Sequence, residues 1–162
     1  MKPNYLTILI TTLCIFFNAC HNSNTAPQLQ LADSLIDKRA DSALCILEKL
    51  SIEEISNKSA KAMYALLLTE ALDKNFKSHR NDSLILIAVD YYKDNSNNKL
   101  KTKAYYYLGR VYQDNKEYIK ATEAYLTALK TASPNQAPIL QIYNNLALCY
   151  ESQEFYLPAI KT

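Results

Sequence analysis

Residues 104–129 (AYYYLGRVYQDNKEYIKATEAYLTAL) carry small and aromatic residues at fixed offsets, a pattern typical of two short helices packed as an antiparallel hairpin. Gly109 and Ala121 are small where the two helices would cross, since a larger side chain there would force the backbones apart. Tyrosines on either side would fill the wider spaces. We therefore expect the following residues to pack this hairpin: Leu108, Gly109, Tyr112, Ala121, Tyr125 and Ala128.

Weaker copies of the same pattern cover the rest of the chain after residue 27. Residues 28–50 predict a short helical hairpin that caps the stack, residues 59–94 a degenerate repeat, residues 98–132 the best-formed repeat and residues 136–162 a truncated one. In the last repeat, Tyr156 and Ala159 are expected to open a second helix. The residues expected to pack this last repeat are Leu146, Ala147, Tyr150 and Ala159.

Composition supports an all-helical chain and excludes several functions. The sequence has 162 residues, of which 49% are hydrophobic, and a single glycine, which disfavours turn-rich β architectures. Glycine-rich phosphate-binding loops require more than one glycine, so the sequence contains none of these motifs. Because 18 basic and 16 acidic residues leave a net charge of only +2, we expect no nucleic-acid partner.

The first residues are typical of a secretory leader. Residues 5–17 (YLTILITTLCIFF) form an apolar run that is too short for the roughly 30 Å hydrocarbon core of a membrane. The sequence FNAC then ends at Cys20 and resembles a bacterial lipobox, which predicts a lipoprotein signal peptide over residues 1–19, lipidation of Cys20 and a flexible tether over residues 20–27. A plain secreted protein and an uncleaved anchor are the alternatives.

The connection between the helices of the degenerate repeat is longer than a standard turn. Residues 74–81 (KNFKSHRN) contain Lys74, Lys77, His79 and Arg80 around Phe76. Binding of an acidic partner by these basic residues is one hypothesis, but we expect a solvated loop.

Together these features resemble the tetratricopeptide-repeat lipoproteins and membrane regulators of Bacteroidota. The resemblance rests on the lipobox-like leader and on DSALCIL (41–47), ALDKN (71–75), DSLILIAVDYY (82–92) and AYYYLGRVY (104–112). It implies an all-α, right-handed solenoid of antiparallel helix hairpins, with about seven or eight helices and an incomplete last repeat. Longer members of the group continue into further repeats and sometimes an output domain.

In this family the first helix of each repeat lines a concave face that binds peptides. The matching positions imply a binding groove made of Lys103, Tyr106, Arg110, Gln113, Asp114, Gln141, Asn144 and Asn145. Lys103 and Arg110 would pair with acidic groups of a peptide, and the asparagines would bond its backbone.

Catalytic and metal chemistry find little support in the sequence. The two histidines, His21 and His79, stand outside any motif that would activate a nucleophile. Cys20, Cys45 and Cys149 lack the close pairing of structural zinc ligands. We therefore expect no catalytic residue, no metal site and no cofactor, and we expect free thiols at Cys45 and Cys149.

The sequence thus predicts a lipid-anchored adaptor of the bacterial cell envelope, on either membrane, that binds a protein or peptide partner. One alternative is the sensor portion of a membrane-bound regulator that lacks its output domain. A glycan-binding outer-membrane lipoprotein is a further alternative, although the chain has no tryptophan for an aromatic platform. Self-association through the uncovered last repeat is also expected.

Overall fold

The computed structural model describes residues 25–79, 81–133 and 138–156, and these residues are helical with no strand among them. The all-α prediction is confirmed. The predicted leader, the lipidation site Cys20 and the packing residue Ala159 lie outside the described residues. The described helices are α2 (Thr25–Leu35), α3 (Ala40–Leu47), the 3-10 turn η2 (Ile52–Glu54), α4 (Lys58–Lys74), α5 (Ser83–Tyr92), α6 (Asn98–Asp114), α7 (Tyr118–Thr131) and α8 (Ile139–Tyr156).

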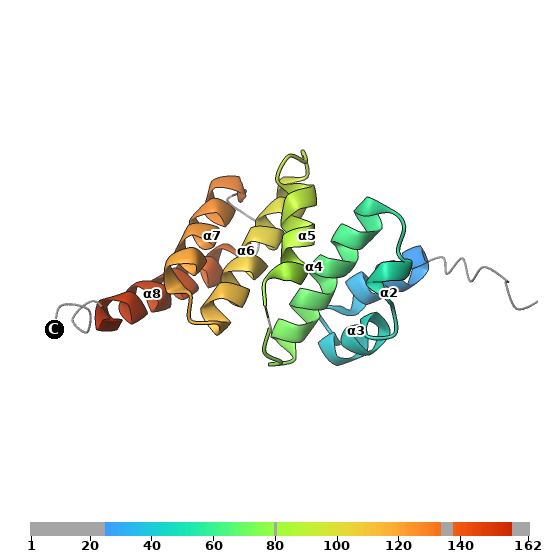
Figure 1. The fold of residues 1–162 in the computed structure, drawn as a ribbon, viewed down its shortest axis with the longest axis horizontal. Helices are drawn as coiled ribbons and strands as arrows, with labels where there is room; N and C mark the ends of the chain where they lie inside the picture. Colours follow the sequence, from blue (N-terminus) through green and yellow to red (C-terminus); the bar gives the residue numbers. More distant parts are fainter. Residues whose placement is uncertain (1–24, 80, 134–137, 157–162) are drawn as a thin grey trace, which may run out of the picture.

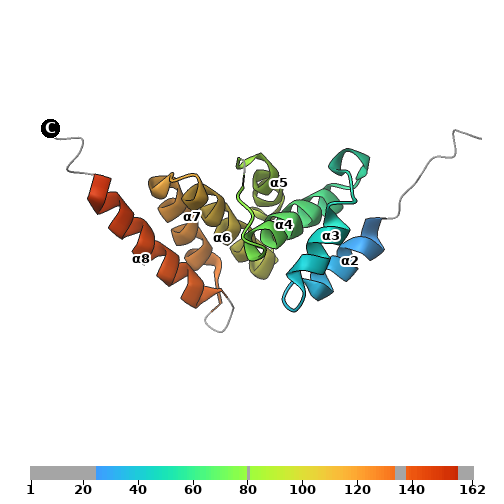
Figure 2. The ribbon, with the colours of Figure 1, turned by 90° about the horizontal axis from the view of Figure 1, so that it is seen from below.

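The helices pair as successive hairpins along one long axis. In Figure 1 the chain runs from α2 and α3 at one end, through α4 and α5, to α6, α7 and α8 at the other. Each helix contacts the next in the chain, and the first helices of successive hairpins also touch, α2 against α4 and α4 against α6. Figure 2 shows the same succession from below, with α2 and α8 at opposite ends. Neighbouring hairpins therefore share faces, and the first helices form one continuous side.

Asparagine side chains define where the two longest central helices begin. Asn57 accepts hydrogen bonds from the backbone amides of Ser59 and Ala60 at 2.8 and 3.1 Å, and Asn97 accepts one from Leu100 at 3.2 Å. These bonds satisfy amides that have no partner inside the helix. Between α6 and α7 the chain reverses at Lys116, whose φ of 62° lies in the left-handed region.

The predicted hairpin core is present between α6 and α7. Ala121, Tyr125 and Ala128 are fully buried, and Leu108 is nearly so. A Cβ at Gly109 would lie 2.4 Å from Cε1 of Tyr125, so the absent side chain is what lets the tyrosine ring fill this crossing. The corresponding residues of the preceding hairpin, Ala88 and Tyr92, are buried as well. The same pattern of a buried alanine followed four residues later by a buried tyrosine therefore occurs in the cores of both hairpins.

The last repeat differs from the prediction. α8 continues as one helix through Tyr156, so Tyr156 ends this helix and does not open a second one. The turn after α6 uses Asn115 and Lys116, whereas the aligned residues of α8 are Gln153 and Glu154, which favour helix more strongly than asparagine does. Ala147 and Tyr150, also expected to pack between helices, are exposed because no described helix covers that face of α8.

The helical domain also begins earlier than predicted, because α2 starts at Thr25 and takes in the last residues assigned to the tether. Pro27 lies in the first turn of α2, where a proline costs little since its missing amide would have no helical partner. Among the described helices, none combines the length and the apolar character needed to cross a bilayer.

Candidate functional site

A groove of about 1060 Å³ runs along the side formed by the first helices of the hairpins. Its lining comes from α2, α4 and α6, with the start of α8 closing one end. It combines carboxylates, lysines and tyrosines. The lining residues are Asp33, Ile36, Asp37, Met63, Glu70, Asp73, Lys74, Asn97, Lys99, Leu100, Lys103, Tyr106, Tyr107, Ser133, Pro138 and Gln141.

Glu70 forms a buried charge cluster at the groove. Its side chain is only 3% exposed, and Lys74 and Lys103 each form an ion pair with one of its two oxygens, at 3.1 Å in the case of Lys74. Tyr107 also hydrogen-bonds to Glu70, and burial, followed by the nearby Glu70 charge, raises the pKa of this tyrosine. Since removing one partner would leave a buried charge unpaired, Lys103 holds α6 to α4 and is not free to leave Glu70 for a ligand.

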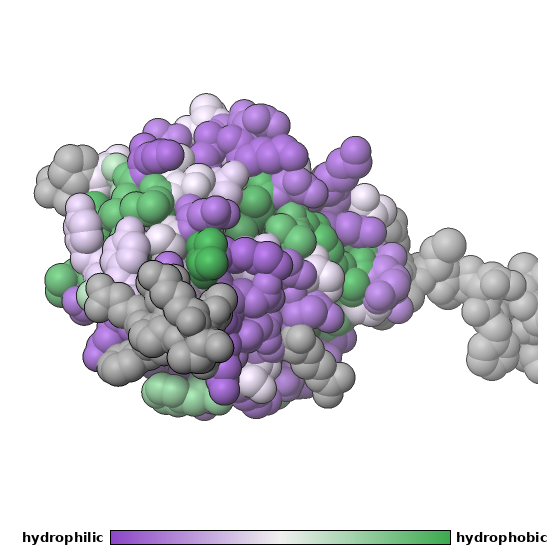
Figure 3. All heavy atoms as spheres, turned by 60° about the vertical axis from the view of Figure 1, so that its left-hand side comes forward, coloured by the Kyte–Doolittle hydropathy of each residue, from purple (hydrophilic) through white to green (hydrophobic). Residues whose placement is uncertain are grey.

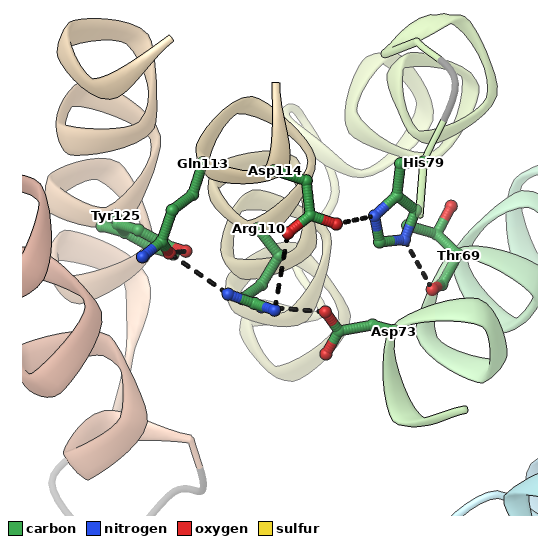
Figure 4. Close-up of polar contacts among 7 residues, drawn as sticks. All are labelled: Thr69, Asp73, His79, Arg110, Gln113, Asp114 and Tyr125. Carbon is green, nitrogen blue, oxygen red and sulfur yellow. Dashed lines mark hydrogen bonds and ion pairs between the residues drawn. The ribbon is translucent and has the colours of Figure 1, made fainter. Parts of the chain in front are cut away.

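Arg110 is the centre of a second cluster of charged and polar residues, which links α6 to α4 (Figure 4). Its Nε donates to Asp73 at 2.8 Å, and its Nη1 donates to Gln113 at 3.2 Å. Asp114 lies 3.7 Å from Nη2. Burial disfavours the charged guanidinium, but Asp73, Tyr125 and Asp114 together outweigh it and the pKa of Arg110 is raised. Gln113 in turn accepts a hydrogen bond at 2.8 Å from the hydroxyl of Tyr125, which links the cluster to the hairpin core.

His79 completes this cluster, contrary to the expectation of a solvated loop. Its side chain is 4% exposed, with Nδ1 2.8 Å from Asp114 and Nε2 3.2 Å from the backbone oxygen of Thr69 (Figure 4). The loop therefore folds back over α4 and α6. Lys74 belongs to the last turn of α4. Phe76, 98% exposed with a φ of 55°, and its neighbours Lys77 and Ser78 are exposed and fit the predicted solvated loop.

Asp73, His79 and Asp114 place three potential metal-ligand atoms within 4.8 Å of one another. The sequence did not predict this grouping. Arg110 already reaches both carboxylates, so its guanidinium supplies the positive charge that a metal ion would bring. The arrangement is best explained as a buried hydrogen-bonded ion cluster that fixes the loop.

The predicted groove residues divide into three groups. Lys103, Tyr106 and Gln141 line the groove, as expected. Arg110, Gln113 and Asp114 are neighbours, but they bond within the molecule. The remaining two lie on α8, where Asn145 hydrogen-bonds to Tyr106 and Asn144 is exposed.

Sequence reasoning missed the contribution of α2 and α4 to the groove. Asp33, Glu70 and Asp73 line it, although the groove predicted from the sequence contains none of them. A signal was present, because Glu70 and Asp73 interrupt an otherwise apolar helix with two carboxylates three residues apart, on one helical face. Acidic residues inside such a stretch need a basic partner, and Lys103 and Arg110 supply it.

Comparisons of the chain with protein-family models, with curated proteins and with solved structures give no match.

Proposed function

We propose that the chain is a lipid-anchored adaptor of the bacterial cell envelope, built as a tetratricopeptide-like solenoid, that binds an extended segment of another protein in the groove along its first helices. The observation that carries the proposal is the groove itself, which is continuous over α2, α4 and α6 and reaches α8. A groove of this length suits a segment of several residues better than a small metabolite.

The charges at the groove favour a peptide of mixed charge. Asp33 of α2 is an exposed carboxylate at one edge, and Asp37, just after α2, pairs with Lys74, whereas Lys99 and Lys103 lie on the α6 side. Nucleic acid would need a surface that is basic throughout. A segment with a lysine or arginine facing Asp33 and a carboxylate towards the α6 side fits both edges.

The pairings of Lys103 and Arg110 change the role we assign to them. Each holds a carboxylate of α4, so we propose that they set the width and stiffness of the groove. Direct contacts with the partner are assigned to the exposed lining residues Asp33 and Gln141. A pre-formed groove lowers the entropy cost of binding.

Photo-crosslinking in cells tests this proposal. A benzophenone amino acid is placed at Asp33 or at Gln141, and at Glu123, an exposed residue of α7 outside the groove, as the matched control. The expected result is an adduct from both groove positions to the same short segment of one protein, and no such adduct from the control position. Adducts that form equally at all three positions, or at the control alone, would contradict the proposed site.

A further inference from the structure

The outward face of α8 is an exposed apolar surface at one end of the molecule. Ile142, Leu146 and Cys149 face inward and are buried, whereas Leu140, Tyr143, Leu148 and Tyr150 are 69%, 58%, 50% and 49% exposed. Figure 3 shows this end of the molecule, with hydrophobic residues in patches among polar ones. Four large apolar side chains on one helix exceed the scattered exposure that is normal for a surface.

The same face of α6 is covered by a helix. Residues of α8 repeat those of α6 at an offset of 38, so that Tyr143, Ala147 and Tyr150 correspond to Tyr105, Gly109 and Tyr112. In α6 the small residue of this set lies against Tyr125 of the neighbouring helix α7. In α8 the equivalent Ala147 is exposed, with large side chains on both sides. The shape of this face therefore suits the close approach of another helix.

The charge pattern of α8 indicates which helix that is. Residues 139–150 contain no Asp, Glu, Lys or Arg. In a two-fold dimer each surface meets a copy of itself, so any charge at the centre would face its like. The first charged residue is the exposed Glu151, one turn beyond Ala147, and in an antiparallel pair centred on Ala147 it would meet Tyr143 of the other copy rather than its own copy. The net charge of +2 adds little repulsion between whole chains.

The available area also matches a self-contact of modest strength. The four exposed side chains and the small residues between them offer about 500 Å² per copy, or about 1,000 Å² for a pair, which is the lower limit for a specific interface. An interface of this size predicts a reversible dimer rather than a permanent one.

We propose that a second copy of this chain packs its α8 antiparallel against the exposed face of α8, about a two-fold axis that passes near Ala147. The groove remains open in such a dimer, because only Gln141 and its neighbours at the start of α8 line it. The dimer would thus present two grooves on one assembly and raise the avidity for a partner with two binding segments.

Sedimentation equilibrium on the full chain, held in a mild detergent because of the apolar leader, tests the dimer. The wild type is expected to show a reversible monomer–dimer equilibrium, and Ala147→Glu to weaken it at least tenfold, because two carboxylates would face each other at the axis. Phe76→Glu is the matched control, since Phe76 is an exposed apolar residue far from α8 in the chain; it should leave the equilibrium unchanged. Circular dichroism should show equal helix content for all three proteins.

A disulfide test locates the axis. In a background with Cys14, Cys20 and Cys45 changed to serine, which leaves only the buried Cys149 of the four cysteines, Ala147→Cys should form a covalent dimer under mild oxidation much faster than Phe76→Cys does. A wild type that stays monomeric up to about 100 µM would overturn the proposal and would mean that residues 157–162 or a different protein cover the face. Equal dimerisation of Ala147→Glu and wild type, or equal crosslinking of the two cysteine variants, would overturn it too.

Discussion

The crossing of α6 and α7 gives a sharp prediction for the single glycine, because two opposing effects can be weighed. Alanine in place of glycine inside a helix normally stabilises by about 1 kcal/mol. Here, however, the new Cβ would lie 2.4 to 2.8 Å from three ring atoms of Tyr125, well inside the normal carbon–carbon contact of about 3.5 Å. The ring is fully buried and its hydroxyl is bonded to Gln113, so it has no space to move into.

The steric cost should win. Overpacking of this kind costs about 1–3 kcal/mol. After the helix-propensity gain is subtracted, Gly109→Ala is expected to lower the free energy of unfolding by up to about 2 kcal/mol, which corresponds to a fall of up to about 8 °C in the melting temperature for a domain of this size. The assay is urea unfolding followed by circular dichroism at 222 nm.

The double mutant separates the contact from other effects of the substitution. In a Tyr125→Leu background the clashing ring is gone, so Gly109→Ala should become stabilising by about 0.5–1 kcal/mol. The sign of its effect thus reverses between the two backgrounds. An effect of the same sign and size in both would refute the close contact between Gly109 and Tyr125 and with it the hairpin packing.

Other predictions concern pH, the buried charges and the leader. Burial raises the pKa of Tyr92 to about 12, from about 10 in the unfolded chain, so the folded chain keeps the proton to higher pH. The contribution of Tyr92 to the free energy of unfolding should therefore be constant just below about pH 10 and fall as the pH rises towards 12. Urea titrations at several pH values measure this fall, and a flat profile would contradict it. Lys103→Glu places a second carboxylate beside buried Glu70 and should lower the free energy of unfolding by about 3–5 kcal/mol, whereas Lys103→Gln should lower it less. If both variants unfold at the same urea concentration as the wild type, the ion pair is contradicted. Cys20→Ser should abolish labelling by a palmitate analogue in cells, and unchanged labelling would remove the predicted lipid anchor.

Local patterns predicted the helices and the hairpin core well. Small residues at the crossing and tyrosines beside it are properties of neighbouring turns, which the spacing in the sequence reports directly. Gly109, Ala121 and Tyr125 were found in this way, and the structure buries all three.

The groove was predicted less completely, because its charges pair between hairpins. Which carboxylate of α4 meets Lys103 or Arg110 depends on how α4 and α6 are staggered in space, and no spacing within one helix encodes that stagger. His79 was assigned to solvent for the same reason, since its partner Asp114 is 35 residues away in the chain. The exposed face of α8 was predicted as a packed one, because the sequence pattern implies a covering helix that the described residues do not contain.

The affinity of the groove for its partner segment tests the central claim most directly. Once photo-crosslinking has identified the segment, its synthetic peptide is titrated calorimetrically into wild type, Asp33→Lys and Glu123→Lys, two exposed acidic residues changed in the same way on and off the groove. The proposed function predicts that Asp33→Lys weakens binding at least tenfold while Glu123→Lys binds like wild type. Equal affinities for all three proteins would contradict a partner site in the groove.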